Sequence, residues 1–118
     1  MAYLVDTNIL VDVTRGSITA ADYLDSLAGA WSISTITCLE LLAGARTQRE
    51  TTDLDLVLSG YRAIPPNEDI TRRAYYLMKT YARSHGLRTL DSLIAATALE
   101  EGLTLVSSGD LKLEVPNY

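Results

Sequence analysis

The chain has 118 residues, of which 47% are hydrophobic and 21% charged, a composition that can bury a core and differs from that of disordered proteins. Its net charge of −5 argues against a generally basic nucleic-acid-binding surface, and its one cysteine, Cys38, excludes an intramolecular disulfide. We expect one domain over residues 1–118 in the reducing cytoplasm, since no apolar run could cross a bilayer and no charged leader opens the sequence.

The first half of the chain opens with an apolar run and a group of helix-capping residues. Residues 3–5 predict a strand, and Asp6, Thr7 and Asn8 precede a predicted helix. The elements predicted next are a helix at residues 19–27, an alternating strand at 31–34, an apolar helix at 37–45 and a more polar helix at 49–58.

The second half predicts two helices between short strands. These elements are a strand at residues 61–64, a helix from Asn67 to about His85, a helix at 90–101, a buried strand at 103–106 and a last strand at 113–115. Short strands that alternate with helices indicate right-handed βαβ units. We therefore predict an α/β fold, a parallel sheet of about five short strands with helices on both faces.

Three acidic residues stand where this fold gathers ligands. Asp6 closes the first strand, and ligands bind at the carboxyl ends of strands in open parallel sheets. Glu40 interrupts an apolar helix, where a carboxylate needs a partner or a cation. Asp91 opens the helix at residues 90–101 and can project toward the same edge of the sheet. If the three converge, mutual repulsion raises the pKa of at least one carboxyl group.

Each acid also has a structural interpretation. Asp6 and Asp91 can simply cap the helices that follow them, and Glu40 can extend its carboxylate from a partly exposed helix face. The single residues therefore leave both interpretations open.

The segments around these acids resemble three signature segments of PIN domains, in the family's order. The segments are Leu4-Val5-Asp6-Thr7-Asn8-Ile9-Leu10, Glu40-Leu41-Leu42-Ala43-Gly44 and Leu90-Asp91-Ser92-Leu93-Ile94-Ala95-Ala96-Thr97-Ala98. The resemblance covers essentially the whole chain, and the short length and the second segment are similar to the VapC branch, the toxins of type II toxin-antitoxin systems. It implies a metal-dependent ribonuclease in which Asp6, Glu40 and Asp91 are catalytic and bind metal.

The segment after the last core strand departs from the family pattern. Relatives usually carry Thr-x-Asn/Asp followed by another acid, whereas this chain has Ser107 for the Thr, Gly109 where Asn is common and Lys112 where some relatives have Asp or His. The resemblance makes Asp110 the expected fourth catalytic and metal-binding acid. Whether the site has three or four carboxylates stays open.

Carboxylates without a histidine cluster indicate a hard cation. Mg²⁺ and Mn²⁺ prefer oxygen ligands, and His85 is the only histidine of the chain. We expect Mg²⁺, or Mn²⁺, as the cofactor. Thr7, Asn8, Ser92 and Ser107 are then candidate donors that orient the carboxylates and the phosphate, although helix caps and turns explain these four residues equally well.

Half of the ten basic residues lie within residues 72–88, interleaved with tyrosines. This stretch can form a local basic face on an acidic protein. Arg72, Arg73, Lys79 and Arg83 are therefore candidate RNA contacts. An ordinary solvated helix and a subunit interface are the alternatives.

The favoured function is an endoribonuclease toxin that hydrolyses RNA phosphodiesters. Its expected partners are an RNA substrate, a cognate antitoxin and a second copy of the chain, with no membrane. Two alternatives stay open: a PIN-type nuclease of RNA maturation or decay without an antitoxin, and a non-catalytic binding module whose acids are structural.

Overall fold

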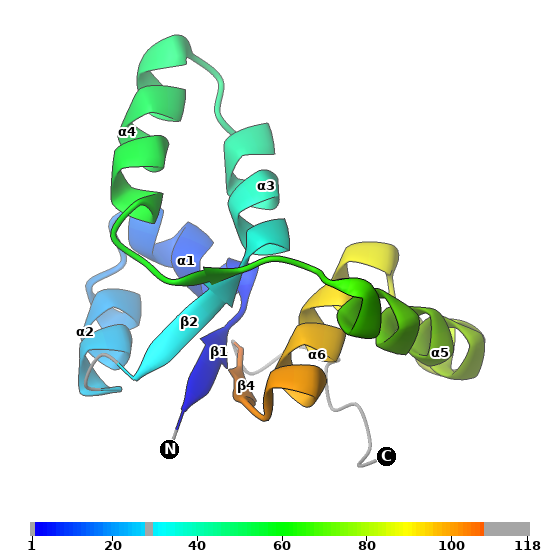
Figure 1. Cartoon of the computed structure of the whole chain (residues 1–118). Helices are drawn as coiled ribbons and strands as arrows, with labels where there is room; N and C mark the ends of the chain where they lie inside the picture. The colour runs from blue at the N-terminus through cyan, green and yellow to red at the C-terminus, as the bar shows by residue number, and fades with distance from the viewer. Residues whose placement is uncertain (1, 28–29, 108–118) are drawn as a thin grey trace.

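The computed structural model describes residues 2–27 and 30–107 (Figure 1). These residues form four strands and six helices. In chain order they are β1 (Tyr3–Val5), α1 (Thr7–Thr14), α2 (Ile18–Ser26), β2 (Trp31–Ser34), α3 (Thr35–Ala43), α4 (Gln48–Leu58), β3 (Ala63–Ile64), α5 (Glu68–His85), α6 (Thr89–Glu101) and β4 (Thr104–Val106). The predicted α/β class is confirmed.

All strand pairs of the sheet are parallel, and the strand order is β3-β2-β1-β4. β1 is a central strand, with Leu4 opposite Ser32 of β2 and Leu105 of β4. The carboxyl ends of β1 and its two neighbours therefore meet at one edge. The strand predicted at residues 113–115 lies outside the described residues, so the sheet has four strands in the part that the structure describes.

Helices cover both faces of the sheet, as predicted (Figure 1). Leu4 and Val5 are fully buried neighbours in β1, and neighbouring strand residues point to opposite faces. Leu4 packs with buried residues of α5 and α6, including Leu77 and Ile94. Val5 belongs to a second cluster that includes Leu10 of α1. The sheet is thus the shared middle layer of two apolar clusters.

Helices α3 and α4 run side by side and rise from the carboxyl edge of the sheet (Figure 1). α3 follows β2 without a loop, because Ser34 ends the strand and its hydroxyl accepts a hydrogen bond from the Ile36 amide at 3.0 Å. This immediate turn carries residues of α3, including Glu40, above the strand ends.

Several predicted boundaries were wrong by a few residues. α3 begins at Thr35, since Ser34 provides the cap, and ends at Ala43. The strand predicted at residues 61–64 is shorter than expected and consists of Ala63–Ile64 (β3) alone. The Tyr61 amide instead donates to the Leu58 carbonyl and continues the turn that ends α4. No described helix is both long and apolar enough to cross a membrane.

Candidate active site

Asp6 is a buried carboxylate at the junction of β1 and α1. Only 3% of the residue is exposed. It is the N-cap of α1, and its Oδ1 accepts the Thr7 amide at 2.7 Å. Its own amide donates to the Val106 carbonyl of β4 at 2.9 Å. The structural interpretation of Asp6 as a cap is therefore correct, but the cap uses Oδ1, and Oδ2 receives no hydrogen bond from any residue that the structure describes.

Glu40 is tied to this junction through a threonine. Its Oε1 accepts the hydroxyl of Thr7 at 2.6 Å, across 33 positions of the sequence. Glu40 is half-buried, and its side chain crosses from α3 to the first residue of α1. The alternative that Glu40 merely extends its carboxylate toward solvent is wrong.

Asp91 lies in the first turn of α6 and is half-buried. The alternative that Asp91 caps this helix was wrong, because α6 begins at Thr89 and Arg88 occupies the N-cap position without a side-chain cap. Within the described part of the chain, no hydrogen bond or ion pair involves the Asp91 carboxylate. A helix cap therefore does not explain this acid.

The three acids lie close enough for their charges to interact. Burial raises the pKa of Asp6 from 3.8 to about 6, the hydrogen bond from the Thr7 amide opposes this rise, and the charges of Asp91 and Glu40 add to it. The predicted repulsion between the acids is present, but burial raises the pKa of Asp6 more than the neighbouring charges do. Among the described residues no lysine, arginine or histidine forms an ion pair with any of the three acids.

This donor set suits a cation that prefers oxygen ligands. Asp6, Glu40 and Asp91 each offer a carboxylate oxygen that no described residue engages, and their negative charge has no counter-ion among the described residues. Among residues 2–27 and 30–107, however, no three aspartate, glutamate, histidine or cysteine side chains are arranged so that they could hold a metal ion together. Asp110, the predicted fourth acid, lies outside the described residues.

The predicted hydrogen-bonding residues differ in their positions. Thr7 donates a hydrogen bond to Glu40, and Ser107 follows Val106, whose carbonyl accepts the Asp6 amide. Asn8 is exposed. Ser92 is 1% exposed and donates to the Thr89 carbonyl at 2.6 Å, so it serves its own helix and reaches none of the three acids.

Sequence reasoning missed Thr37. This residue of α3 is fully buried, and its hydroxyl oxygen lies 3.0 Å from that of Thr7. Its position three residues before Glu40 is the signal that was available, because residues three apart share a helix face. An apolar cavity of about 420 Å³ adjoins the same face and is lined by Ile36, Leu39, Glu40, Ala43 and Leu90.

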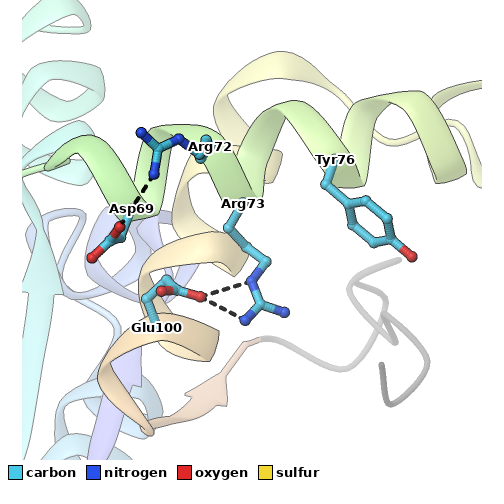
Figure 2. A pocket seen from close by; sticks show the side chains of 5 residues that line it. All are labelled: Asp69, Arg72, Arg73, Tyr76 and Glu100. Atoms are coloured by element: carbon cyan, nitrogen blue, oxygen red, sulfur yellow. Dashed lines mark hydrogen bonds and ion pairs between the residues drawn. The ribbon is translucent and has the colours of Figure 1, made fainter.

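The basic stretch lies on α5, and two of its arginines are already paired. Arg72 forms ion pairs with Glu68 and Asp69 of its own helix. Arg73 reaches across to Glu100 of α6 (Figure 2). Lys79 stands over the ring of Tyr75, 5.4 Å from its centroid. The pocket at this place, lined by Asp69, Arg72, Arg73, Tyr76 and Glu100, therefore mixes both signs of charge.

Fold and site together define a class, the small parallel α/β proteins that gather carboxylates at the carboxyl edge of the sheet. The chain belongs to the PIN domain family, whose model matches residues 3–116. It is 39% identical to Ribonuclease VapC10 of Mycobacterium tuberculosis over 107 residues, covering 88% of this chain and 80% of that relative. The resemblance seen in the sequence is confirmed.

The solved structures that share the fold include the following two. A toxin-antitoxin complex from Klebsiella pneumoniae has a TM-score of 0.81 and 28% identity, covering 98% of this chain and 93% of the matched one. VapBC2 from Rickettsia felis, bound to a DNA fragment from its promoter, has a TM-score of 0.73 and 28% identity, covering 89% of this chain and 85% of the matched one. The likeness thus extends over nearly the full length of the fold.

Proposed function

We propose that this protein is a metal-dependent endoribonuclease that acts as the toxin of a toxin-antitoxin pair. The observation that carries the proposal is Asp6, which is 3% exposed, has a pKa raised to about 6 and faces two further acids without a basic partner among the described residues. Burying a carboxylate beside two other acids lowers the stability of the folded state unless a cation compensates the charge. Its family membership and a relative named as a ribonuclease make RNA the substrate.

In this proposal Asp6, Glu40 and Asp91 hold Mg²⁺ or Mn²⁺, and Asp110 is the fourth ligand. The bound cation supplies activation of the attacking water and neutralises charge on the phosphate. Thr7 keeps one oxygen of Glu40 engaged at 2.6 Å, which directs the other toward the site. The first turns of α1 and α6 present their positive helix ends to the same region and favour a phosphate there.

The proposed partners rest on the relatives. The solved structures that share the fold include a toxin-antitoxin complex, so we propose a cognate antitoxin that binds this domain and a homodimeric assembly. The carboxylate site is the region that such a partner must cover to stop cleavage.

Cleavage of RNA by the purified protein tests the enzymatic part. A 5′-labelled single-stranded RNA is incubated with Mg²⁺, Mn²⁺ or chelator, using wild type, Asp6→Asn and the control Asp12→Asn, whose residue is exposed on α1. We expect cleavage with metal by wild type and the control only. Cleavage in chelator, or undiminished cleavage by Asp6→Asn, would contradict the mechanism.

Co-expression tests the toxin part. Expression of the chain alone should arrest growth, and the product of the reading frame immediately upstream should relieve the arrest and co-purify with the chain. Metal-dependent RNA cleavage without growth arrest or co-purification would instead indicate a nuclease of RNA maturation or decay.

A further inference from the structure

We propose that Thr37 is a positioning residue that holds Glu40 in place through the hydroxyl of Thr7. The inference rests on the proposed function, since it concerns how one of the three carboxylates is kept ready for a divalent cation. Thr37 itself touches neither Asp6 nor Glu40 through any hydrogen bond in the described part of the chain.

The donor and acceptor roles follow from proton counting. Thr7 Oγ1 lies 2.6 Å from Glu40 Oε1 and 3.0 Å from Thr37 Oγ1, but a hydroxyl has one proton to donate. A carboxylate can only accept, so Thr7 donates to Glu40 and accepts from Thr37. The result is a directed chain in which Thr37 donates to Thr7 and Thr7 donates to Glu40.

The backbone explains why Thr37 faces this way. Threonines in helices commonly donate to the carbonyl four residues earlier, and five of the described residues do so: Thr51, Thr52, Thr71, Thr80 and Thr97. For Thr37 the residue four positions earlier is Ile33, which belongs to β2 and not to the helix. Its hydroxyl is therefore available to Thr7, and with 0% exposure it has no access to solvent.

The chain of hydroxyls restrains a side chain that is otherwise free to move. Glu40 is only half-buried and has three rotatable bonds, so without a fixed partner its carboxylate can turn toward water. Hydrogen bonds to an ionised acceptor are stronger than neutral ones, and a donor that is itself a hydrogen-bond acceptor is polarised further. With Thr37 in place, the Thr7 hydroxyl points at Glu40 before any cation arrives.

Mn²⁺ binding in the absence of RNA tests the proposal. The probes are calorimetric titration with Mn²⁺ and the shift in melting temperature that Mn²⁺ causes, each measured on wild type, Thr37→Val and Thr37→Ser. Thr37→Val keeps the shape and removes the hydroxyl, and we expect an approximately tenfold weaker affinity for Mn²⁺, the usual effect of losing a residue that orients a metal ligand. Thr37→Ser keeps the hydroxyl and should restore the wild-type affinity.

A matched control separates positioning from stability. Thr97 is also 0% exposed, and among the described residues its hydroxyl bonds only the Leu93 carbonyl of its own helix, at 2.7 Å. Thr97→Val loses an equally buried hydroxyl and should bind Mn²⁺ as wild type does. In a Glu40→Gln background, Thr37→Val should cause no further loss of affinity, because its effect passes through Glu40.

Equal Mn²⁺ affinity of Thr37→Val and wild type would overturn the proposal, and so would a Thr37→Ser variant as weak as Thr37→Val. Thr37→Ala replaces Thr37→Val if circular dichroism shows the latter unfolded. If neither folds while Thr97→Val does, Thr37 is a core residue and the proposal falls. Wild type that binds no Mn²⁺ would overturn the proposed function, whereas binding lost in Asp6→Asn but retained in Thr37→Val would overturn this inference alone.

Discussion

Arg73 of α5 lies with its Nη2 2.6 Å and its Nε 2.7 Å from Oε2 of Glu100 in α6. Their side chains are 34% and 24% exposed, so the pair is shielded more than the neighbouring pairs of Arg72, whose side chain is 68% exposed. The two arginines follow each other in the sequence but have different surroundings. Arg73 joins two helices, whereas Arg72 stays on the surface of one.

We expect Arg73→Ala to lower the free energy of unfolding by about 1 kcal/mol, because it leaves Glu100 partly buried without its partner. Arg72→Ala should change it by less than about 0.5 kcal/mol, since its pairs are exposed and screened. Urea unfolding at low ionic strength measures both. Equal effects of the two substitutions would show that the link between the helices contributes nothing.

The ion pairs of α5 separate the four predicted RNA-contact residues into two that are paired and two that, among the described residues, are not. Arg72 and Arg73 are paired with acids, whereas Lys79 and Arg83 form no ion pair in the part of the chain that the structure describes. We expect Lys79→Ala/Arg83→Ala to reduce the slope of log affinity against log salt by about 1 to 2 for a single-stranded RNA, with a smaller change for Arg72→Ala. Fluorescence anisotropy with Asp6→Asn as the uncleaving background measures it. An unchanged slope would make α5 an ordinary solvated helix.

Asp6→Asn should stabilise the metal-free protein at neutral pH. A folded pKa raised from 3.8 to about 6 means that the folded state binds the proton more tightly than the unfolded state. The resulting stability is fully present below about pH 4 and is lost as the pH rises through about 6, up to about 3 kcal/mol. Asn cannot ionise and can still accept the Thr7 amide.

Melting temperatures of wild type and Asp6→Asn from pH 4 to pH 8, with chelator present, check this dependence. The two curves should lie close together at pH 4, separate progressively between pH 4 and pH 6 and stay apart above pH 6, with the variant the more stable. A variant that melts lower than wild type at pH 8 would mean that Asp6 acts mainly as a cap and that its charge costs little.

Divalent metal should stabilise wild type more than variants of the site. Mg²⁺ at about a hundred times its dissociation constant stabilises a folded protein that binds it by about 2.7 kcal/mol. Glu40→Gln and Asp91→Asn should lose most of this shift, because each removes one of the three negative charges. Asp53→Asn, a change at an exposed residue of α4, is the matched control and should keep the full shift. Identical shifts in all four proteins would place the metal elsewhere.

Local sequence patterns predicted the elements well where caps and apolar spacing agreed. Asn67 caps α5 through the Ile70 amide, and Gly86 ends that helix at a φ of 64°, as the sequence indicated. The start of α6 was placed one residue late, because Arg88 provides no side-chain cap and leaves no signal at that position. The strand at residues 61–64 was too long, because its apolar residues include Tyr61, which packs against Trp31 as part of a turn.

By itself the sequence determined the α/β class and the family, and it predicted the three acids of the site, because apolar spacing, capping residues and short motifs are properties of neighbouring residues. Only the tertiary structure decided which residues form hydrogen bonds near those acids and how deeply the acids are buried. Ser92 is next to Asp91 yet bonds its own helix, whereas Thr37 and Thr7, 30 positions apart, share a hydrogen bond. Burial and hydrogen bonding depend on which elements the sheet brings together. The raised pKa of Asp6 and the hydrogen bond from Thr7 to Glu40 therefore arise only once β1, α1 and α3 have packed.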